Sequence, residues 1–159
     1  MVLQTDGDVM SLDFHPLHPA LLAVGLYDGV VLVYDVRNKN KQPIYQSSIK
    51  TKKHTDPVWQ VKWNPIPSEN NNFYSISSDG RVMNWILMKD KLEPEEVIRL
   101  KLVNNPVKSK LKNKQNDEET SLISLACGLC FDFNTFDNFA FIVGTEEGNI
   151  HKCSKAYSG

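Results

Sequence analysis

The chain repeats one pattern of apolar runs and turns three times, and this repetition constrains its fold more than any other feature. In each unit, a first apolar run ends on an aromatic residue, a second run follows, and an acidic residue with a glycine introduces a third. From the aromatic to the acidic residue the units span 14, 16 and 14 residues: Phe14 to Asp28, Trp63 to Asp79, and Phe133 to Glu147. Regular self-similarity indicates one supersecondary unit used several times.

The acidic-Gly pairs mark tight hairpins, because glycine accepts positive φ without a steric cost. Each unit therefore predicts strand, loop, strand, hairpin and strand, and a fourth outer strand is expected at about 43–48 and again at about 95–103. Four antiparallel strands in ~40–50 residues is the period of a propeller blade. We predict an all-β fold of propeller blades: blade 1 at about 8–48, blade 2 at about 56–103 and a partial blade 3 at about 122–154.

The second unit resembles a WD40 repeat. Its residues Ser77-Ser78-Asp79-Gly80 lead to Trp85, and His54 precedes Asp79 by 25 residues, as in that family. The resemblance implies a structural hydrogen-bond network of four residues: His54, Ser77, Asp79 and Trp85. The first unit departs from the pattern with Tyr34-Asp35, and the third departs further with Glu147 and Cys153.

A closer similarity is to the WD repeats of dynein intermediate chains, most of all the axonemal outer-arm forms. The segments that carry it are 25–37, 59–63, 73–82 and 144–150. The resemblance implies a non-catalytic scaffold with a seven-bladed propeller that binds the dynein heavy chain and other dynein subunits. It also implies a place in the cytoplasm, on the axoneme of a cilium or flagellum, as part of the cytoskeleton. A generic WD40 interaction adaptor outside dynein is the alternative within the binding class.

The composition argues against other partner classes. With 18 Lys+Arg and 19 Asp+Glu, the formal charge is −1, so the strongly basic signature of nucleic-acid binding is missing. No apolar run reaches the ~18 residues of a membrane span. We find neither a phosphate-binding loop nor a dinucleotide fingerprint, and we expect no cofactor, nucleic acid or membrane partner.

Two short motifs contain residues that could carry chemistry. Cys127 and Cys130 form a C-x-x-C pair, which a thiol-dependent enzyme could use, but the pair leads into a strand rather than a helix. We expect both to be small apolar residues of the sheet core. His15 and His18 are half of a metal site at most, and we expect a solvated turn there.

About 21 extra residues separate the second and third units, and they fall at about 104–121. This stretch carries Lys108, Lys110, Lys112 and Lys114, which would share one side of an extended segment. One interpretation is an electrostatic contact with an acidic partner such as the tubulin tails of microtubules; the other is a charged loop that keeps the strands soluble. Three inter-strand loops are further candidate contacts: Leu17-His18-Pro19, Ile66 to Asn71, and Thr135 to Asn138.

The length sets a last expectation. Propellers close at ~4–8 blades, so 159 residues supply about three of the expected seven. We therefore expect an incomplete propeller, cut within a blade at both ends, that is poorly stable when expressed alone.

Overall fold

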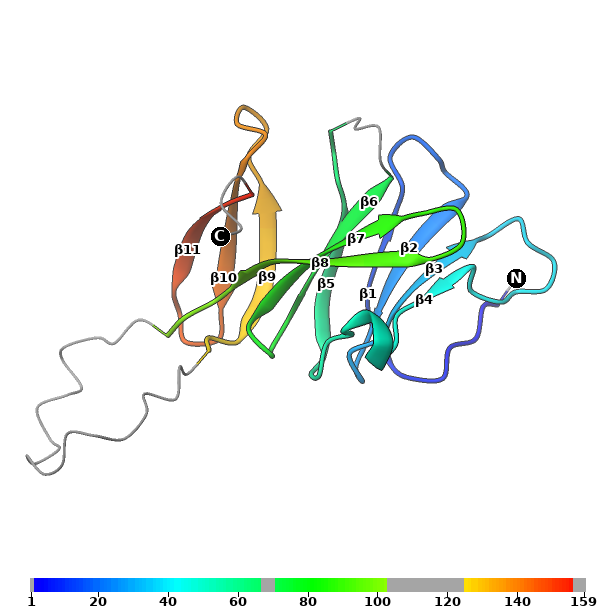
Figure 1. The fold of residues 1–159 in the computed structure, drawn as a ribbon, viewed down its shortest axis with the longest axis horizontal. Coiled ribbons are helices and arrows are strands. Elements are labelled where there is room, and N and C mark those ends of the chain that lie inside the picture. The colour runs from blue at the N-terminus through cyan, green and yellow to red at the C-terminus, as the bar shows by residue number, and fades with distance from the viewer. Residues whose placement is uncertain (1, 67–70, 103–124, 156–159) are drawn as a thin grey trace, which may run out of the picture.

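The computed structural model describes residues 2–66, 71–102 and 125–155, which form three antiparallel sheets set side by side (Figure 1). The first and second sheets have four strands each, in the order β1-β2-β3-β4 and β5-β6-β7-β8, and the third has the order β11-β10-β9. This confirms the predicted all-β class. In the described parts of the chain, no helix is long and apolar enough to cross a membrane.

The strands follow the three units of the sequence. The first sheet is built from Val9–Phe14, Leu21–Leu26, Val31–Asp35 and Tyr45–Gln46 (β1 to β4). The second is built from Val58–Trp63, Asn72–Ser77, Arg81–Leu87 and Leu92–Arg99 (β5 to β8). The third is built from Gly128–Phe133, Ala140–Thr145 and Ile150–Ser154 (β9 to β11), and the short 3-10 helix η1, Ile49–Thr51, lies between β4 and β5.

The two outer strands differ from their expected limits. β4 has only two residues, and β8 begins at Leu92 rather than near residue 95. β8 starts early because a tight turn joins it to β7, with the Met88 N–H donating to the Lys91 carbonyl, so that Leu87 already pairs with Leu92. Pro94 is tolerated in this strand because β8 is the outer edge of its sheet, where one ladder donor can be spared.

The acidic-Gly pairs form the tight turns that the sequence predicts. Gly29, Gly80 and Gly148 have φ of 84°, 79° and 82°, the left-handed conformation that favours glycine. Gly29 also lies in close contact with its neighbour, since a Cβ at this position would stand 2.1 Å from the carbonyl oxygen of His54. The turn of the first sheet therefore packs directly on the segment that enters the second.

The second sheet is buried on both faces. Towards the first sheet, Trp63, Phe73 and Trp85 pack on a cluster that includes Val31 and Val33. Towards the third sheet, Tyr74, Ile76 and Val82 pack on a set that includes Phe131, Phe141 and Val143. This double burial explains why all six residues of β6 are buried.

Polar contacts between the innermost strands align neighbouring sheets. Asp13 accepts a hydrogen bond from the Trp63 backbone N–H at 2.9 Å, and its own carbonyl accepts the Trp63 indole N–H at 3.0 Å. Between the second and third sheets, the Gln60 side chain accepts the Phe131 N–H at 2.8 Å. The described sheets form an open fan rather than a closed ring (Figure 1).

Candidate functional site

The most highly connected polar group is a hydrogen-bonded set around His54 in the second unit. His54 Nδ1 lies 2.9 Å from a carboxylate oxygen of Asp79, and its Nε2 lies 2.7 Å from the hydroxyl of Ser75. The Trp85 indole N–H donates to the same hydroxyl at 2.7 Å. His54, Ser75 and Trp85 are completely buried, so each polar group depends on the others for its partner.

The donor and acceptor capacity of each side chain determines the direction of these hydrogen bonds. The Trp85 indole can only donate, so the Ser75 oxygen accepts from it. The arrangement that then uses every hydrogen has Ser75 donating to Nε2 of His54, while Nδ1–H donates to the Asp79 carboxylate. We therefore assign a neutral imidazole with its proton on Nδ1.

The serine of the network is not the one expected. The Ser77 hydroxyl has other partners: it donates to the Asp56 carbonyl and accepts the Asp79 N–H. Ser75 and Ser77 lie on the same face of β6, two residues apart, so alternation alone could not distinguish them. Ser77 is the last residue of β6, whereas Ser75 lies two residues earlier, within hydrogen-bond distance of both the His54 and the Trp85 ring.

Arg81, which the sequence reading did not single out, completes the environment of Asp79. Its guanidinium donates to Asp79 at 2.8 Å and also to the carbonyls of Lys52 and Lys53, just before His54. Burial raises the pKa of Asp79, but the hydrogen bonds from His54 and Arg81 and the positive charge of Arg81 outweigh burial and hold this pKa well below its ordinary value. The sequence feature that could have indicated this role is a basic residue directly after the acidic-Gly turn.

These contacts make the group structural rather than catalytic. A serine nucleophile must be able to reach a substrate, whereas Ser75 is fully buried and already holds both rings. In the third unit the Glu147 carboxylate accepts the backbone N–H of Cys127 at 3.0 Å, as the Asp79 carboxylate accepts that of Thr55 at 3.1 Å.

The two cysteines are not both core residues, so that expectation was wrong in part. Cys127 is half-buried and Cys130, in β9, is exposed, whereas Cys153, two strands further on in β11, is buried. Cys130 lies on the outward face of β9 because alternation turns Phe131 towards the second sheet. Burial and the neighbouring Glu147 and Glu146 raise the pKa of Cys127, which is the opposite of what an activated thiol needs.

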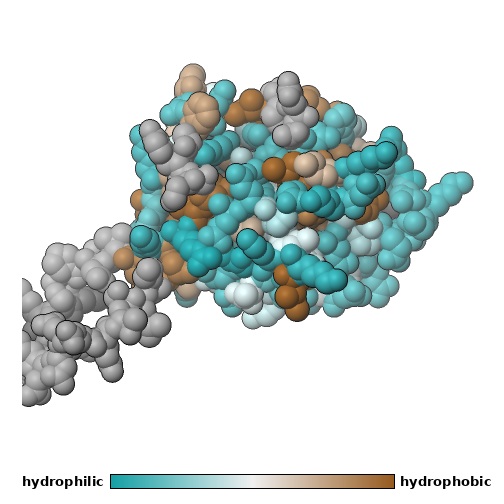
Figure 2. Space-filling model, viewed as in Figure 1, coloured by the Kyte–Doolittle hydropathy of each residue, from teal (hydrophilic) through white to brown (hydrophobic). Residues whose placement is uncertain are grey.

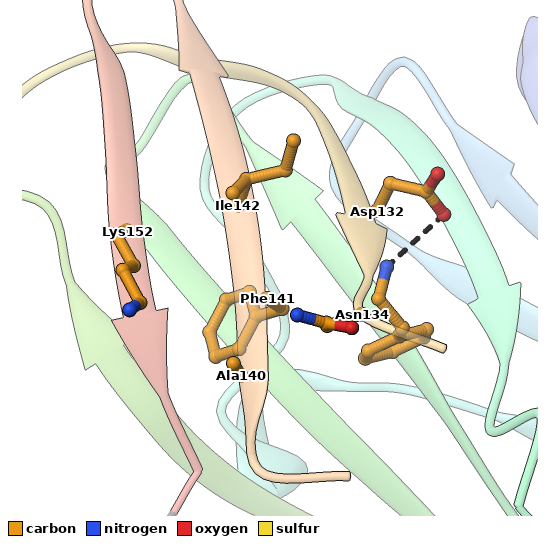
Figure 3. A pocket seen from close by; sticks show the side chains of 7 residues that line it. Asp132, Asn134, Ala140, Phe141, Ile142 and Lys152 are labelled. Carbon is orange, nitrogen blue, oxygen red and sulfur yellow. Dashed lines mark hydrogen bonds between the residues drawn. The ribbon is translucent and has the colours of Figure 1, made fainter. Parts of the chain in front are cut away.

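The outward face of the third sheet carries a shallow pocket of about 310 Å³ (Figure 3). Its wall contains the side chains of Ala140, Ile142 and Lys152, and Asp132 lies at its edge (Figure 3). Ile142 is 50% exposed there. This lining is mainly apolar and brings no set of catalytic groups together.

Some of the remaining predicted contacts lie within the residues that the structure describes, and others lie outside them. Lys108, Lys110, Lys112 and Lys114 lie outside the described residues, as does 67–70 within the second candidate loop. The other two candidate loops are exposed, with Leu17 62% and Phe136 99% accessible. His15 is buried, and its Nδ1 accepts the N–H groups of Leu17 and His18. Among the described residues, no cluster of three or more His, Cys, Asp or Glu side chains could hold a metal ion.

Comparison with known proteins finds close relatives along the whole chain. Over 99% of its own length, the chain is 49% identical to "Dynein intermediate chain 2, ciliary" of the sea urchin Heliocidaris crassispina. It is 46% identical over 97% of its length to "Dynein, 78 kDa intermediate chain, flagellar outer arm" of the alga Chlamydomonas reinhardtii. It is 42% identical to "Dynein axonemal intermediate chain 1" of cattle, Bos taurus. The chain spans about 22% of the length of each of these relatives, and no family model matches it.

Proposed function

From its homology to axonemal dynein intermediate chains, including an outer-arm form, we propose that this chain is part of a non-catalytic scaffold subunit of an axonemal dynein. The observation that carries the proposal is the identity of 49% and 46% to a ciliary and a flagellar relative along almost the entire chain. In this proposal the subunit binds the dynein heavy chain and supports ciliary or flagellar motility by holding subunits together.

The physical character of the chain supports binding over chemistry. The polar groups with the densest contacts, around His54, are buried and already paired with one another. Among the accessible apolar residues, Leu17 and Phe136 lie in loops. Loops held by a rigid sheet scaffold are well suited to broad contacts with protein partners.

The test is association of the whole protein with the motor. A tagged full-length protein, expressed in ciliated or flagellated cells, should be extracted from axonemes with dynein and sediment with the heavy chain through a density gradient. The matched control carries Trp85→Ala, which removes a fully buried indole and should abolish both folding and association. Sedimentation of the unaltered protein away from every heavy chain would favour the generic adaptor.

Direct microtubule contact through Lys108, Lys110, Lys112 and Lys114 is a separate part of the proposal, supported by their spacing in the sequence. Changing all four to serine should lower co-sedimentation with microtubules at low salt, because exposed charges are screened least when the ionic strength is low. Equal co-sedimentation of the variant would reject this contact while leaving heavy-chain binding untouched.

A further inference from the structure

The loops that follow the innermost strands share one turn in all three units. In each loop, the side chain directly after the terminal aromatic residue accepts the backbone N–H of the residue two positions later. The three bonds are 3.0, 3.3 and 2.8 Å long: His15 to Leu17, Asn64 to Ile66, and Asn134 to Phe136. A histidine and two asparagines thus serve the same purpose at one repeat position.

Backbone bonds close the same loops and hold them in place. The N–H of the capping residue donates to a carbonyl at the start of the next strand, at 2.9, 3.0 and 3.0 Å in the three units: His15 to Leu21, Asn64 to Asn72, and Asn134 to Ala140. Nδ1 of His15 is the acceptor because two backbone N–H groups point to it, and burial lowers the pKa of His15, which favours the neutral ring. The backbone at residues 17, 66 and 136 is therefore held by local contacts that do not involve the side chains of these residues.

Each of these turns presents an apolar side chain, and we call Leu17, Ile66 and Phe136 the loop-tip row. Leu17 is 62% exposed and Phe136 is 99% exposed, while Ile66 is half-buried. Phe139, in the same loop as Phe136, is 60% exposed. Packing within the described chain does not explain why all three units have an apolar residue at this position, because Leu17 and Phe136 are largely exposed.

The loop-tip row lies along one edge of the molecule. The connections β1–β2, β5–β6 and β9–β10 leave the same end of their sheets, at the upper edge of Figure 1. In Figure 2 apolar residues stand along this edge among hydrophilic ones. The three acidic-Gly turns and η1 lie towards the opposite edge (Figure 1).

Basic side chains occupy two outer connections that leave the same end of the first and second sheets as the row's loops and lie at the side of the molecule in Figure 1. Lys39 and Lys41 lie in the β3–β4 connection and Lys89 in the β7–β8 turn, and all three are exposed. These two connections are joined, because the Tyr45 hydroxyl donates to the Met88 carbonyl at 2.6 Å. None of the ion pairs among the described residues involves these three lysines, so their charge is available to a partner.

We infer that the loop-tip row is an interaction surface for an amphipathic protein segment whose apolar side chains are flanked by acidic residues. Rigid, isolated anchors such as Leu17 and Phe136 suit discrete pockets or ridges on a protein partner, as in interface hot spots. The exposed lysines outside the row provide charge complementarity to acidic flanks and speed association. The inference rests on the scaffold function proposed above, but it does not depend on which complex the scaffold serves.

Site-specific cross-linking in the full-length protein tests the surface directly. A photoreactive amino acid at position 17 or 136 should capture the same partner segment, with acidic and apolar residues identified by mass spectrometry. The matched control position is Tyr27, which is 56% exposed but lies in a turn at the opposite edge. Equal capture of that segment from position 27, or capture of a basic segment from position 136, would overturn the inference.

A binding measurement with variants provides the second arm. The double variant Leu17→Ser with Phe136→Ser should weaken binding of the captured segment about tenfold or more, as loss of hot-spot side chains does. The control Tyr27→Ser with Ile49→Ser removes two exposed apolar residues at the opposite edge and should leave binding unchanged. Loss of binding to anionic phosphatidylserine vesicles in the first variant, without loss of a protein partner, would instead assign the row to a membrane surface.

Heavy-chain association measured on the same samples separates the two proposals. If the double variant loses its cross-linked segment and still sediments with the heavy chain, the row is supported and the dynein proposal stands. If the unaltered protein cross-links an acidic segment but never sediments with a heavy chain, the row is supported and the dynein proposal fails. If neither position 17 nor position 136 captures a partner in assembled dynein, the row is rejected.

Discussion

The hydroxyl of Ser75 lies 2.7 Å from Nε2 of His54, with both residues fully buried in the second unit. The same hydroxyl accepts the Trp85 indole N–H. One serine therefore satisfies two rings that come from different segments of the chain. Its removal leaves both ring nitrogens without a partner and away from water.

Ser75→Ala should be more destabilising than Ser77→Ala. An unsatisfied buried polar group costs about 1–3 kcal/mol, and Ser75→Ala leaves two of them, so we expect a loss of about 2–4 kcal/mol in the free energy of unfolding. Ser77→Ala affects only backbone groups of Asp56 and Asp79 at the strand end, and we expect about 1 kcal/mol. Urea unfolding of the full-length variants measures both, and the reverse order would contradict the assigned network.

Asp79 should make the protein sensitive to acid. Its pKa is depressed in the folded state, so its contribution to stability is complete above its unfolded pKa of about 3.9 and decreases as pH falls below that value. Asp79→Asn should lower the free energy of unfolding at pH 7 and flatten its decline between about pH 5 and pH 2. Denaturant midpoints across this range provide the measurement.

Asp132→Asn is the matched control for the acid experiment. Asp132 pairs with Lys62 on the surface, where its side chain is 63% exposed, and exposed pairs contribute at most about 1 kcal/mol. Its pH profile should stay close to that of the unaltered protein. If Asp79→Asn gave the same steep decline as the unaltered protein, the pairing of Asp79 with His54 and Arg81 would not be what protects the fold from acid.

The strand order was predictable from the sequence because its signals are local. Apolar runs bounded by Asp-Gly and Glu-Gly determine where strands turn, and Gly29, Gly80 and Gly148 adopt the positive φ that those turns need. The partner of His54 was not predictable in the same way. Ser75 and Ser77 share a face, and only the depth of the ring in the sheet selects between them.

Other features arise from tertiary register and leave little trace in a single unit. β1, β5 and β9 each shift register at one residue, four positions before the terminal aromatic: Met10, Trp59 and Leu129. A bulge that is filled by three different residue types carries no local pattern. The turn that supports the loop-tip row was hidden for a similar reason, because His15 and Asn64 accept the same bond with unlike side chains.

The three hairpin glycines should respond unequally to alanine. All three have positive φ, which costs a non-glycine residue about 1 kcal/mol. A Cβ at Gly29 would also stand 2.1 Å from the His54 carbonyl oxygen, whereas a Cβ at Gly148 meets nothing within 4 Å. Thermal unfolding should therefore show a small decrease in Tm for Gly148→Ala and a decrease several times larger for Gly29→Ala. Equal decreases would mean that the first turn does not pack on the segment around His54.

The three cysteines should react in an order set by exposure and pKa. Cys130 is exposed, Cys127 is half-buried with a pKa raised by burial and two glutamates, and burial also raises the pKa of the enclosed Cys153. Because the thiolate is the reactive form, iodoacetamide at pH 8 should label Cys130 first, Cys127 more slowly and Cys153 only as the fold opens. Mass spectrometry of the folded full-length protein over time gives the order, and labelling in denaturant gives the unprotected rates. Labelling of Cys127 before Cys130 would indicate an activated thiol and revive the enzyme hypothesis, whereas equal protection of Cys130 and Cys153 would mean that another surface covers the outward face of the third sheet.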